Sequence, residues 1–170
     1  RVFFSTLFKR DKKLGFENDL ATGYKVSDDK LTWTVTIRDD AKFTDGEKVT
    51  AQDVAFTYQT AKESGSEIDL TMIDKITAKD DTTIEFKLNR TYSAFMERLA
   101  YLGIVPEHAY DENFKDNPIG SGPYEFVQWD KGQQVIAKAN ENYYGDKPQI
   151  KQLTMVFLDT DAAYSALQKG

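Results

Sequence analysis

Residues 119–148, IGSGPYEFVQWDKGQQVIAKANENYYGDKP, are the stretch that says most about the fold of this chain. Gly120 and Gly122 permit backbone angles that are closed to other residues, and Pro123 fixes φ just before an extended run. The sequence Asp-Lys-Gly at 130–132 separates two β-prone runs, which predicts the turn of a hairpin. By itself, the stretch therefore predicts a β-hairpin with tight turns at its ends.

A second informative block is residues 31–62, LTWTVTIRDDAKFTDGEKVTAQDVAFTYQTAK. Its first part alternates in character. Trp33, Val35 and Ile37 fall on one side of an extended chain, and threonines fall on the other. This alternation over residues 32–38 is typical of an antiparallel strand that is buried on one face only.

The second part of the same block predicts a helix. Thr50 is a good N-cap, and Asp53, three residues later, resembles the acidic partner of a capping box. The Asp53 carboxylate also suits the positive end of the helix dipole. We expect the helix to run to about Glu63, with Gly65 ending it. Its buried face is expected to contain Val54, Tyr58 and Ala61.

Elsewhere the pattern predicts shorter elements. Ser93 is expected to cap another helix, and Gly103 and Pro106 to stop it. The apolar side of that helix would carry Phe95, Met96, Leu99 and Leu102. The other expected elements are strands at 73–78, 83–88 and 152–158, a short helix or loop at 107–117 and a helix at 162–169. Because strands and helices do not alternate strictly, the order indicates an α+β fold.

Composition bounds the class of protein. The 170 residues are 40% hydrophobic, which is enough for one domain with a core or for two small subdomains. No run approaches the ~20 apolar residues of a membrane span, so no direct span of a membrane is expected. The chain has no cysteine, which excludes disulfides and Cys-ligated metals. The net charge is −6 and lysines are interleaved with acids, which argues against a nucleic-acid partner.

Residues for covalent chemistry are sparse. His108 is the only histidine, whereas catalytic triads and metal sites need several converging groups, so we expect it to be an ordinary surface residue. Pairs of adjacent acids fall at predicted turns, where Asp bonds the nearby backbone. These pairs are at 28–29, 39–40 and 80–81. We therefore expect no catalytic residue, no metal site and no cofactor.

Both blocks resemble the family 5 extracellular solute-binding proteins, the peptide- and nickel-binding receptors of ABC importers. The first block is similar to the family's G-[ST]-G-P-[YW] and N-x-x-Y-[WY]-G-x-K-P motifs. The second is similar to its alternating strand, K-F-x-[DN]-G-E turn and T-A-x-D-V helix start. The resemblance implies mixed β-sheets with flanking helices, forming part of a type II periplasmic-binding-protein-like N-terminal lobe.

The resemblance also implies a division of the chain. Residues 22–117 would form an inserted subdomain, and 1–21 with 118–170 would belong to the first ligand-binding lobe, which would be incomplete. Family members are much longer than this chain. No secretory signal peptide is present and the chain begins at Arg1, so we expect an internal fragment of the N-terminal half.

The function implied by the resemblance is capture, not catalysis. Such a receptor binds oligopeptides or dipeptides outside the cell and delivers them to the membrane subunits of an ABC permease. It would be exported, and either periplasmic or lipid-anchored at the outer face of the plasma membrane. Relatives contact their ligands through segments that correspond to 64–72 and 100–105. The candidate ligand-binding residues on these segments are Asp69, Leu70, Thr71, Tyr101 and Leu102.

Three alternatives remain open. A nickel-chelate receptor of the same family is one, although such relatives carry Arg and Trp in these segments and this chain has neither there. A glycan hydrolase that uses carboxylates such as Asp45 or Glu47 is another, and it would need two carboxylates facing across a cleft. The third is a sensor that borrows the same fold, which would require a fused DNA-binding or membrane segment.

Overall fold

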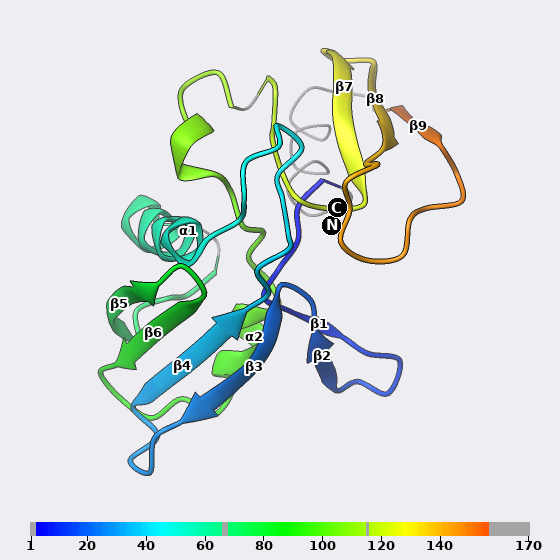
Figure 1. Ribbon diagram of the computed structural model, residues 1–170. Coiled ribbons are helices and arrows are strands. Elements are labelled where there is room, and N and C mark those ends of the chain that lie inside the picture. Colours follow the sequence, from blue (N-terminus) through cyan, green and yellow to red (C-terminus); the bar gives the residue numbers. More distant parts are fainter. Residues whose placement is uncertain (1–2, 66–67, 115, 157–170) are drawn as a thin grey trace. The chain divides into compact units, whose positions relative to one another are not determined.

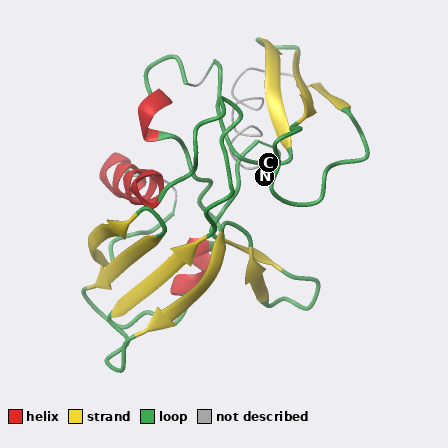
Figure 2. Cartoon of the chain, in the orientation of Figure 1, coloured by secondary structure: helices red, strands yellow, loops and turns green. Residues whose placement is uncertain are grey.

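The computed structural model describes residues 3–65, 68–114 and 116–156. Contacts divide the chain into two compact units. Unit 1 comprises Arg1–Ser5, Asp40–Val49 and His108–Gly170, and unit 2 comprises Thr6–Asp39 and Thr50–Glu107. Figures 1 and 2 show antiparallel sheets and separate helices along the chain, which confirms the α+β fold class.

Compact units and ligand-binding lobes are different divisions of a chain. The contacts place residues 6–21 in unit 2, and residues 40–49 and 108–117 in unit 1. The lobes implied by the resemblance are defined on longer members of the family, so the inserted subdomain at 22–117 stays a prediction.

Unit 2 is built on a four-stranded antiparallel sheet with the strand order β3-β4-β6-β5. Its strands are β3 (Ala21–Val26), β4 (Thr32–Ile37), β5 (Ile73–Asp80) and β6 (Thr83–Leu88). Trp33 of β4 lies opposite Phe86 of β6. Val35 in the same way lies opposite Ile84, and all four side chains are buried. Cross-strand partners share a face, so the alternation predicted for 32–38 is confirmed and continues onto β6.

Two helices cover the apolar face of this sheet. They are α1 (Ala51–Ser64) and α2 (Phe95–Leu99). Edge-to-face rings join them to the strands: the Tyr58 ring centroid lies 5.1 Å from that of Phe86. The Phe95 ring also makes edge-to-face contacts, with its centroid 5.5 Å from that of Phe86 and 5.2 Å from that of Trp33. This geometry favours aromatic pairs beyond the burial of their surface, and burial raises the pKa of the Tyr58 hydroxyl.

The capping box predicted at the start of α1 is confirmed. The Asp53 carboxylate accepts hydrogen bonds from the Thr50 N–H at 3.0 Å and from the Thr50 hydroxyl at 3.1 Å. At the other end, Gly65 adopts a φ of 67°, the left-handed conformation that commonly ends a helix. On the predicted buried face, Val54 and Tyr58 are buried and Ala61 is half-buried.

The prediction for α2 is wrong in its extent and in its cap. The helix has five residues, and its N-cap is Ala94, with no side-chain cap hydrogen bond, rather than Ser93. The Phe95 N–H donates to the Tyr92 carbonyl, so a turn runs directly into the helix and leaves no extended N-cap residue. Of the four residues predicted on its apolar face, Phe95 and Leu99 are buried, whereas Met96 and Leu102 are half-buried.

Three strands near the start of the chain escape the sequence pattern. They are β1 (Phe8–Arg10), β2 (Phe16–Asn18) and β3. β1 and β2 pair antiparallel as a small hairpin, with Phe8 opposite Asn18. The first two have three residues each, which is too short to show a period of two. The third has six residues, but its burial does not alternate regularly, and it pairs with β4.

Unit 1 contains a three-stranded antiparallel sheet with the order β7-β8-β9. Its strands are β7 (Tyr124–Asp130), β8 (Gln134–Ala139) and β9 (Gln152–Val156), and a 3-10 turn η1 (Glu107–Ala109) precedes them. The predicted hairpin is confirmed, with Gly132 at a φ of 78° in its turn. The strand predicted at 152–158 is confirmed as far as the described residues reach. The helix predicted at 162–169 lies outside them.

Gly120 is required for a reason that differs from the one predicted. Neither Gly120 nor Gly122 adopts a positive φ. Instead, a Cβ at Gly120 would lie 1.9 Å from the carbonyl oxygen of Phe3. The Gly122 N–H donates to that same oxygen at 2.9 Å, and the Thr44 N–H donates to the Gly120 carbonyl at 2.9 Å. The turn therefore needs glycine for close approach between backbones.

Candidate ligand-binding site

The five candidate ligand-binding residues lie in unit 2, on two short segments. The first segment precedes β5 and the second follows α2. Tyr101 is 50% exposed, whereas Leu70 is only 3% exposed and belongs to the core of the unit. Asp69 and Thr71 are exposed and Leu102 is half-buried. Of the five candidates, Leu70 is therefore the one whose side chain is buried.

Asp69 is an exposed carboxylate that its neighbours hold in the ionised form. Its Oδ1 accepts a hydrogen bond from the Thr71 hydroxyl at 2.7 Å and another from the Thr71 N–H at 2.9 Å. The bond from the hydroxyl is the main cause that lowers the pKa of Asp69, followed by the bond from the N–H. Arg90 and Arg98 lower it further through their charges. Turns of this kind are common in ordinary loops.

Arg98 joins the two segments and was not singled out by the sequence. Its Nε donates to the backbone oxygen of Asp69 at 3.0 Å, and a terminal nitrogen donates to the Tyr92 hydroxyl at 2.9 Å. Its own carbonyl accepts the Tyr58 hydroxyl at 3.0 Å. The side chain of Arg98 thus ties α2 to the first segment, and the Arg98 carbonyl accepts the Tyr101 N–H at 3.4 Å at the start of the second. The sequence signal that could have identified Arg98 is a single Arg within a short and mostly apolar stretch.

The arrangement offers recognition by charge, hydrogen bonding and ring contact. Asp69 can pair with a cationic group, and the exposed ring of Tyr101 can pack against an apolar side chain. The Thr71 hydroxyl already donates to Asp69, so it retains its acceptor function. No pair of nucleophile and base is formed by these residues.

The histidine and the acids of unit 1 lie at exposed turns. The His108 Nε2 is 2.6 Å from Asp45 Oδ2, and its side chain is 42% exposed, as expected for a surface residue. Asp45 Oδ1 accepts the Glu47 N–H at 3.0 Å, which is an ordinary turn contact. Asp45 and Glu47 are both exposed. The two acids named for a glycan hydrolase thus sit two residues apart in one turn, not across a cleft.

The paired acids of unit 2 also serve turns, as predicted. Asp29 Oδ1 accepts the Leu31 N–H at 3.0 Å, and Asp80 Oδ1 accepts the Thr82 N–H at 2.9 Å. Among the described residues, no group of three or more His, Cys, Asp or Glu side chains could hold a metal ion. No helix in the described ranges is long and apolar enough to span a membrane.

Comparison with known proteins places the chain. The model of the family described as "Bacterial extracellular solute-binding proteins, family 5 Middle" matches residues 15–170. The chain belongs to this family. The sequence resemblance seen in its two blocks is therefore confirmed over nearly the whole length.

Individual members of family 5 agree with this assignment. The probable D,D-dipeptide-binding periplasmic protein DdpA of Escherichia coli is 34% identical, over 86% of this chain and 31% of its own. The oligopeptide-binding protein AppA of Bacillus subtilis is 34% identical, over 99% of this chain and 34% of its own. This chain thus spans about a third of the length of these relatives.

Solved structures from family 5 share the fold. AppA of Bacillus subtilis in complex with a nonapeptide has a TM-score of 0.82 at 30% identity, covering 98% of this chain and 36% of that chain. NikZ from Campylobacter jejuni in complex with Ni(L-His) has a TM-score of 0.86 at 32% identity, with the same coverage. One scaffold therefore carries peptide and metal-chelate ligands in its relatives.

The role of Arg98 in positioning the site is open to a direct test. We expect Arg98→Ala to lower the free energy of unfolding by about 1–2 kcal/mol, because charged hydrogen bonds to Asp69 and Tyr92 are lost at a partly exposed position. Amide hydrogen exchange should accelerate at residues 69–72. The matched control is Arg90→Ala, which removes an exposed Arg lying 5.9 Å from the Tyr92 ring. Equal exchange in both variants would contradict the positioning role.

Proposed function

We propose that this chain is part of the substrate-binding component of an ABC importer, which captures oligopeptides or dipeptides outside the cell and delivers them to the membrane permease. The observation that carries the proposal is the family match over residues 15–170, joined to relatives named for dipeptide and oligopeptide binding. Asp69 and Tyr101 support it, since a carboxylate and a ring suit the amine and the side chains of a peptide.

The proposed receptor performs no covalent chemistry. In it, residues 22–117 form the inserted subdomain, and 1–21 with 118–170 belong to the first lobe. Two lobes close over the ligand by a hinge motion, and the closed form docks on the permease. The protein is exported, and is either periplasmic or held at the outer face of the plasma membrane by a lipid.

A nickel chelate is the second candidate ligand. The likeness to NikZ in complex with Ni(L-His) favours it. Against it, residues 64–72 and 100–105 contain neither Arg nor Trp, the residue types that the resemblance leads us to expect in a chelate-binding member. The peptide proposal therefore takes precedence.

The proposal predicts different behaviour for the isolated chain and for a chimera. The 170-residue chain alone offers one side of a cleft, so isothermal titration with a mixed oligopeptide library should give no micromolar binding. A chimera in which residues 15–170 replace the matching part of AppA should bind peptides, because the second lobe is then present. Circular dichroism and thermal unfolding establish that the chimera is folded.

Variants of the chimera locate the contact. Tyr101→Ala and Asp69→Asn should each weaken peptide binding by about ten-fold, which corresponds to one good contact. Tyr24→Ala, at another exposed tyrosine of unit 2, is the matched control and should leave binding unchanged. A folded chimera that binds Ni(L-His) and no peptide would replace the peptide proposal by the nickel one. Micromolar binding by the isolated chain would contradict the need for a second lobe.

A further inference from the structure

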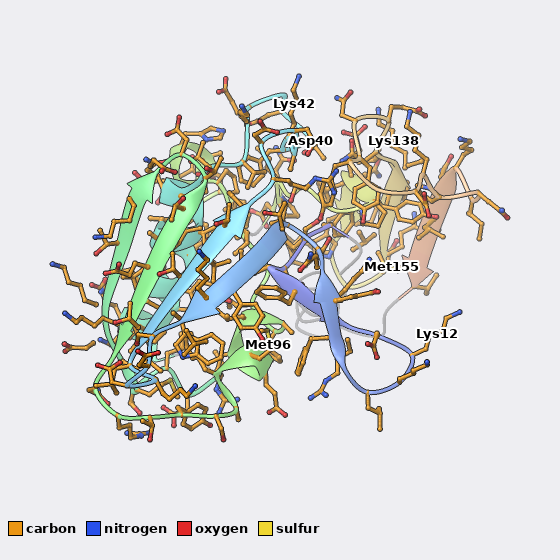
Figure 3. All side chains as sticks on the ribbon, turned by 60° about the horizontal axis from the view of Figure 1, so that its bottom comes forward. Lys12, Asp40, Lys42, Met96, Lys138 and Met155 are labelled. Carbon is orange, nitrogen blue, oxygen red and sulfur yellow. The ribbon has the colours of Figure 1, made fainter. Side chains whose placement is uncertain are left out.

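The turn that joins β1 to β2 presents three exposed residues in a row. Lys12, Lys13 and Leu14, called here the hairpin tip, follow Asp11, whose carboxylate bonds the turn from inside. Its Oδ1 accepts the Lys13 N–H and the Gly15 N–H, each at 2.8 Å. Figure 3 shows Lys12 at the outer end of this hairpin. The tip is therefore a built turn that points its side chains into solvent.

Leu14 is unusual at this position on two counts. Its φ is 65°, in the left-handed region that leucine disfavours and glycine readily adopts. Its side chain is 82% exposed, the highest among the exposed large apolar residues of the chain that are described. Neither backbone conformation nor burial therefore explains a leucine here. A residue held in a disfavoured conformation is a pointer to function.

The lysines beside Leu14 make the hairpin tip positively charged. Lys12 and Lys13 have no carboxylate partner for their ammonium groups among the described residues. The cations lower on the hairpin are already paired, Lys9 with Glu17 and Arg10 with Glu97. The Asp11 carboxylate is engaged with the backbone of the turn. An acidic chain of net charge −6 thus carries, within its described part, two cations without a carboxylate partner beside the most exposed leucine of that part.

We propose that the hairpin tip contacts an anionic phospholipid surface, with Leu14 entering the boundary of the acyl chains and Lys12 and Lys13 meeting the phosphate groups. A basic and apolar side-chain set is what such a surface binds. A fluid surface needs no shape complementarity. A stable protein partner would need roughly 1,000 Å² of matched area, far more than three residues at a turn supply. This contact is separate from peptide binding.

The size of the effect follows from the same side chains. Each Lys close to an anionic surface raises the partition coefficient by about five-fold. Burying a large part of one leucine raises it by about ten-fold. The contact is therefore weak in solution, and it orients a receptor that is already near the membrane.

The test is co-sedimentation of the 170-residue chain with vesicles of phosphatidylcholine, with and without phosphatidylglycerol. Binding is expected only with phosphatidylglycerol. It should fall about ten-fold in Leu14→Gly and about 25-fold in the double variant Lys12→Gln with Lys13→Gln. The matched control removes two other exposed lysines of unit 2, Lys75→Gln with Lys87→Gln, which are cross-strand partners on the sheet. It makes the same change in net charge and should bind as the parent does.

The Leu14→Gly variant also distinguishes a loss of vesicle contact from a loss of folding. Glycine fits the left-handed conformation, so Leu14→Gly should raise the urea midpoint while it weakens vesicle binding. Because the chain has no cysteine, Leu14→Cys can carry one environment-sensitive fluorophore, whose emission should shift to the blue on anionic vesicles. The same label at Lys87→Cys should not shift. No binding to anionic vesicles, equal binding by Leu14→Gly, or an equal loss in the Lys75 and Lys87 control would each overturn the proposal.

Discussion

Replacing Gly120 with alanine should lower the free energy of unfolding by about 3 kcal/mol or more, at the upper end of overpacking changes. The new Cβ would lie 1.9 Å from the Phe3 carbonyl oxygen and 2.9 Å from Cδ1 of Phe4. The first of these atoms is backbone, so it cannot turn away as the end of a side chain can. Moving it breaks the hydrogen bond that the Gly122 N–H donates to it.

The damage should extend along the turn. The Gly120 carbonyl accepts the Thr44 N–H at 2.9 Å, and the Ser121 carbonyl accepts the Ser5 hydroxyl at 3.1 Å. Both bonds join stretches of unit 1 that are distant in the sequence, and both depend on the position of this turn. We therefore expect the loss of tertiary structure in unit 1 to be larger than one lost contact would cause.

Urea denaturation followed by circular dichroism measures this change. The matched control is Gly23→Ala in β3, where an added Cβ meets nothing within 4 Å and φ is not positive. That variant should lie within about 0.5 kcal/mol of the parent, or be slightly more stable. If Gly120→Ala matched Gly23→Ala, the close approach to Phe3 would not be a constraint on the fold.

The elements that the sequence predicts well are those whose signal is local. The alternation at 32–38 places a strand, and the Thr50–Asp53 pair with Gly65 places both ends of α1. The turn at 130–132 places the hairpin. In each case the residues that identify the element also form it, so neighbours in the sequence are sufficient.

The elements that escape prediction depend on distant partners. β1 and β2 have three residues each and exist through pairing with one another. α2 has five residues and is held by ring contacts from Phe95 to Trp33 and Phe86, which come from two strands. No local period can report such contacts. The cap expected from Ser93 fails for a local reason, since a turn leads directly into the helix.

The candidate site shows the same division. A resemblance carries over positions in the chain, so it identifies Leu70 but does not reveal that its side chain is buried. It also misses Arg98, whose importance comes from a bond to the backbone of Asp69, 29 residues earlier. Gly120 was correctly singled out for the wrong reason, because a close approach to Phe3 is invisible until the fold brings the two together.

Asp53→Ala should be the second large effect, at about 3 kcal/mol. Loss of the cap at Thr50 accounts for about 1 kcal/mol. The other oxygen of the carboxylate, Oδ1, accepts the Glu107 N–H at 3.0 Å. Removing it leaves that partly buried N–H without an acceptor, which costs about 1–3 kcal/mol. One buried side chain thus holds both the start of α1 and the segment after α2.

Three variants separate these contributions in urea denaturation. Thr50→Ala should show only the loss of the cap, and Asp53→Asn should fall between it and Asp53→Ala because it keeps an acceptor oxygen for Glu107. Asp28→Ala, at an exposed turn, should stay within about 0.5 kcal/mol of the parent.

The loss of Asp53 should also affect the segment that carries Tyr101. The Thr57 hydroxyl bonds the Asp53 carbonyl at 2.7 Å and accepts the Val105 N–H at 3.1 Å, so the same turn of α1 holds residues 105–107 at two points. Tyr101 lies four residues before Val105. Asp53→Ala should therefore speed amide exchange at 101–107, while Thr50→Ala should not. Equal exchange in the two variants would show that the carboxylate caps the helix and does nothing for the segment that carries Tyr101.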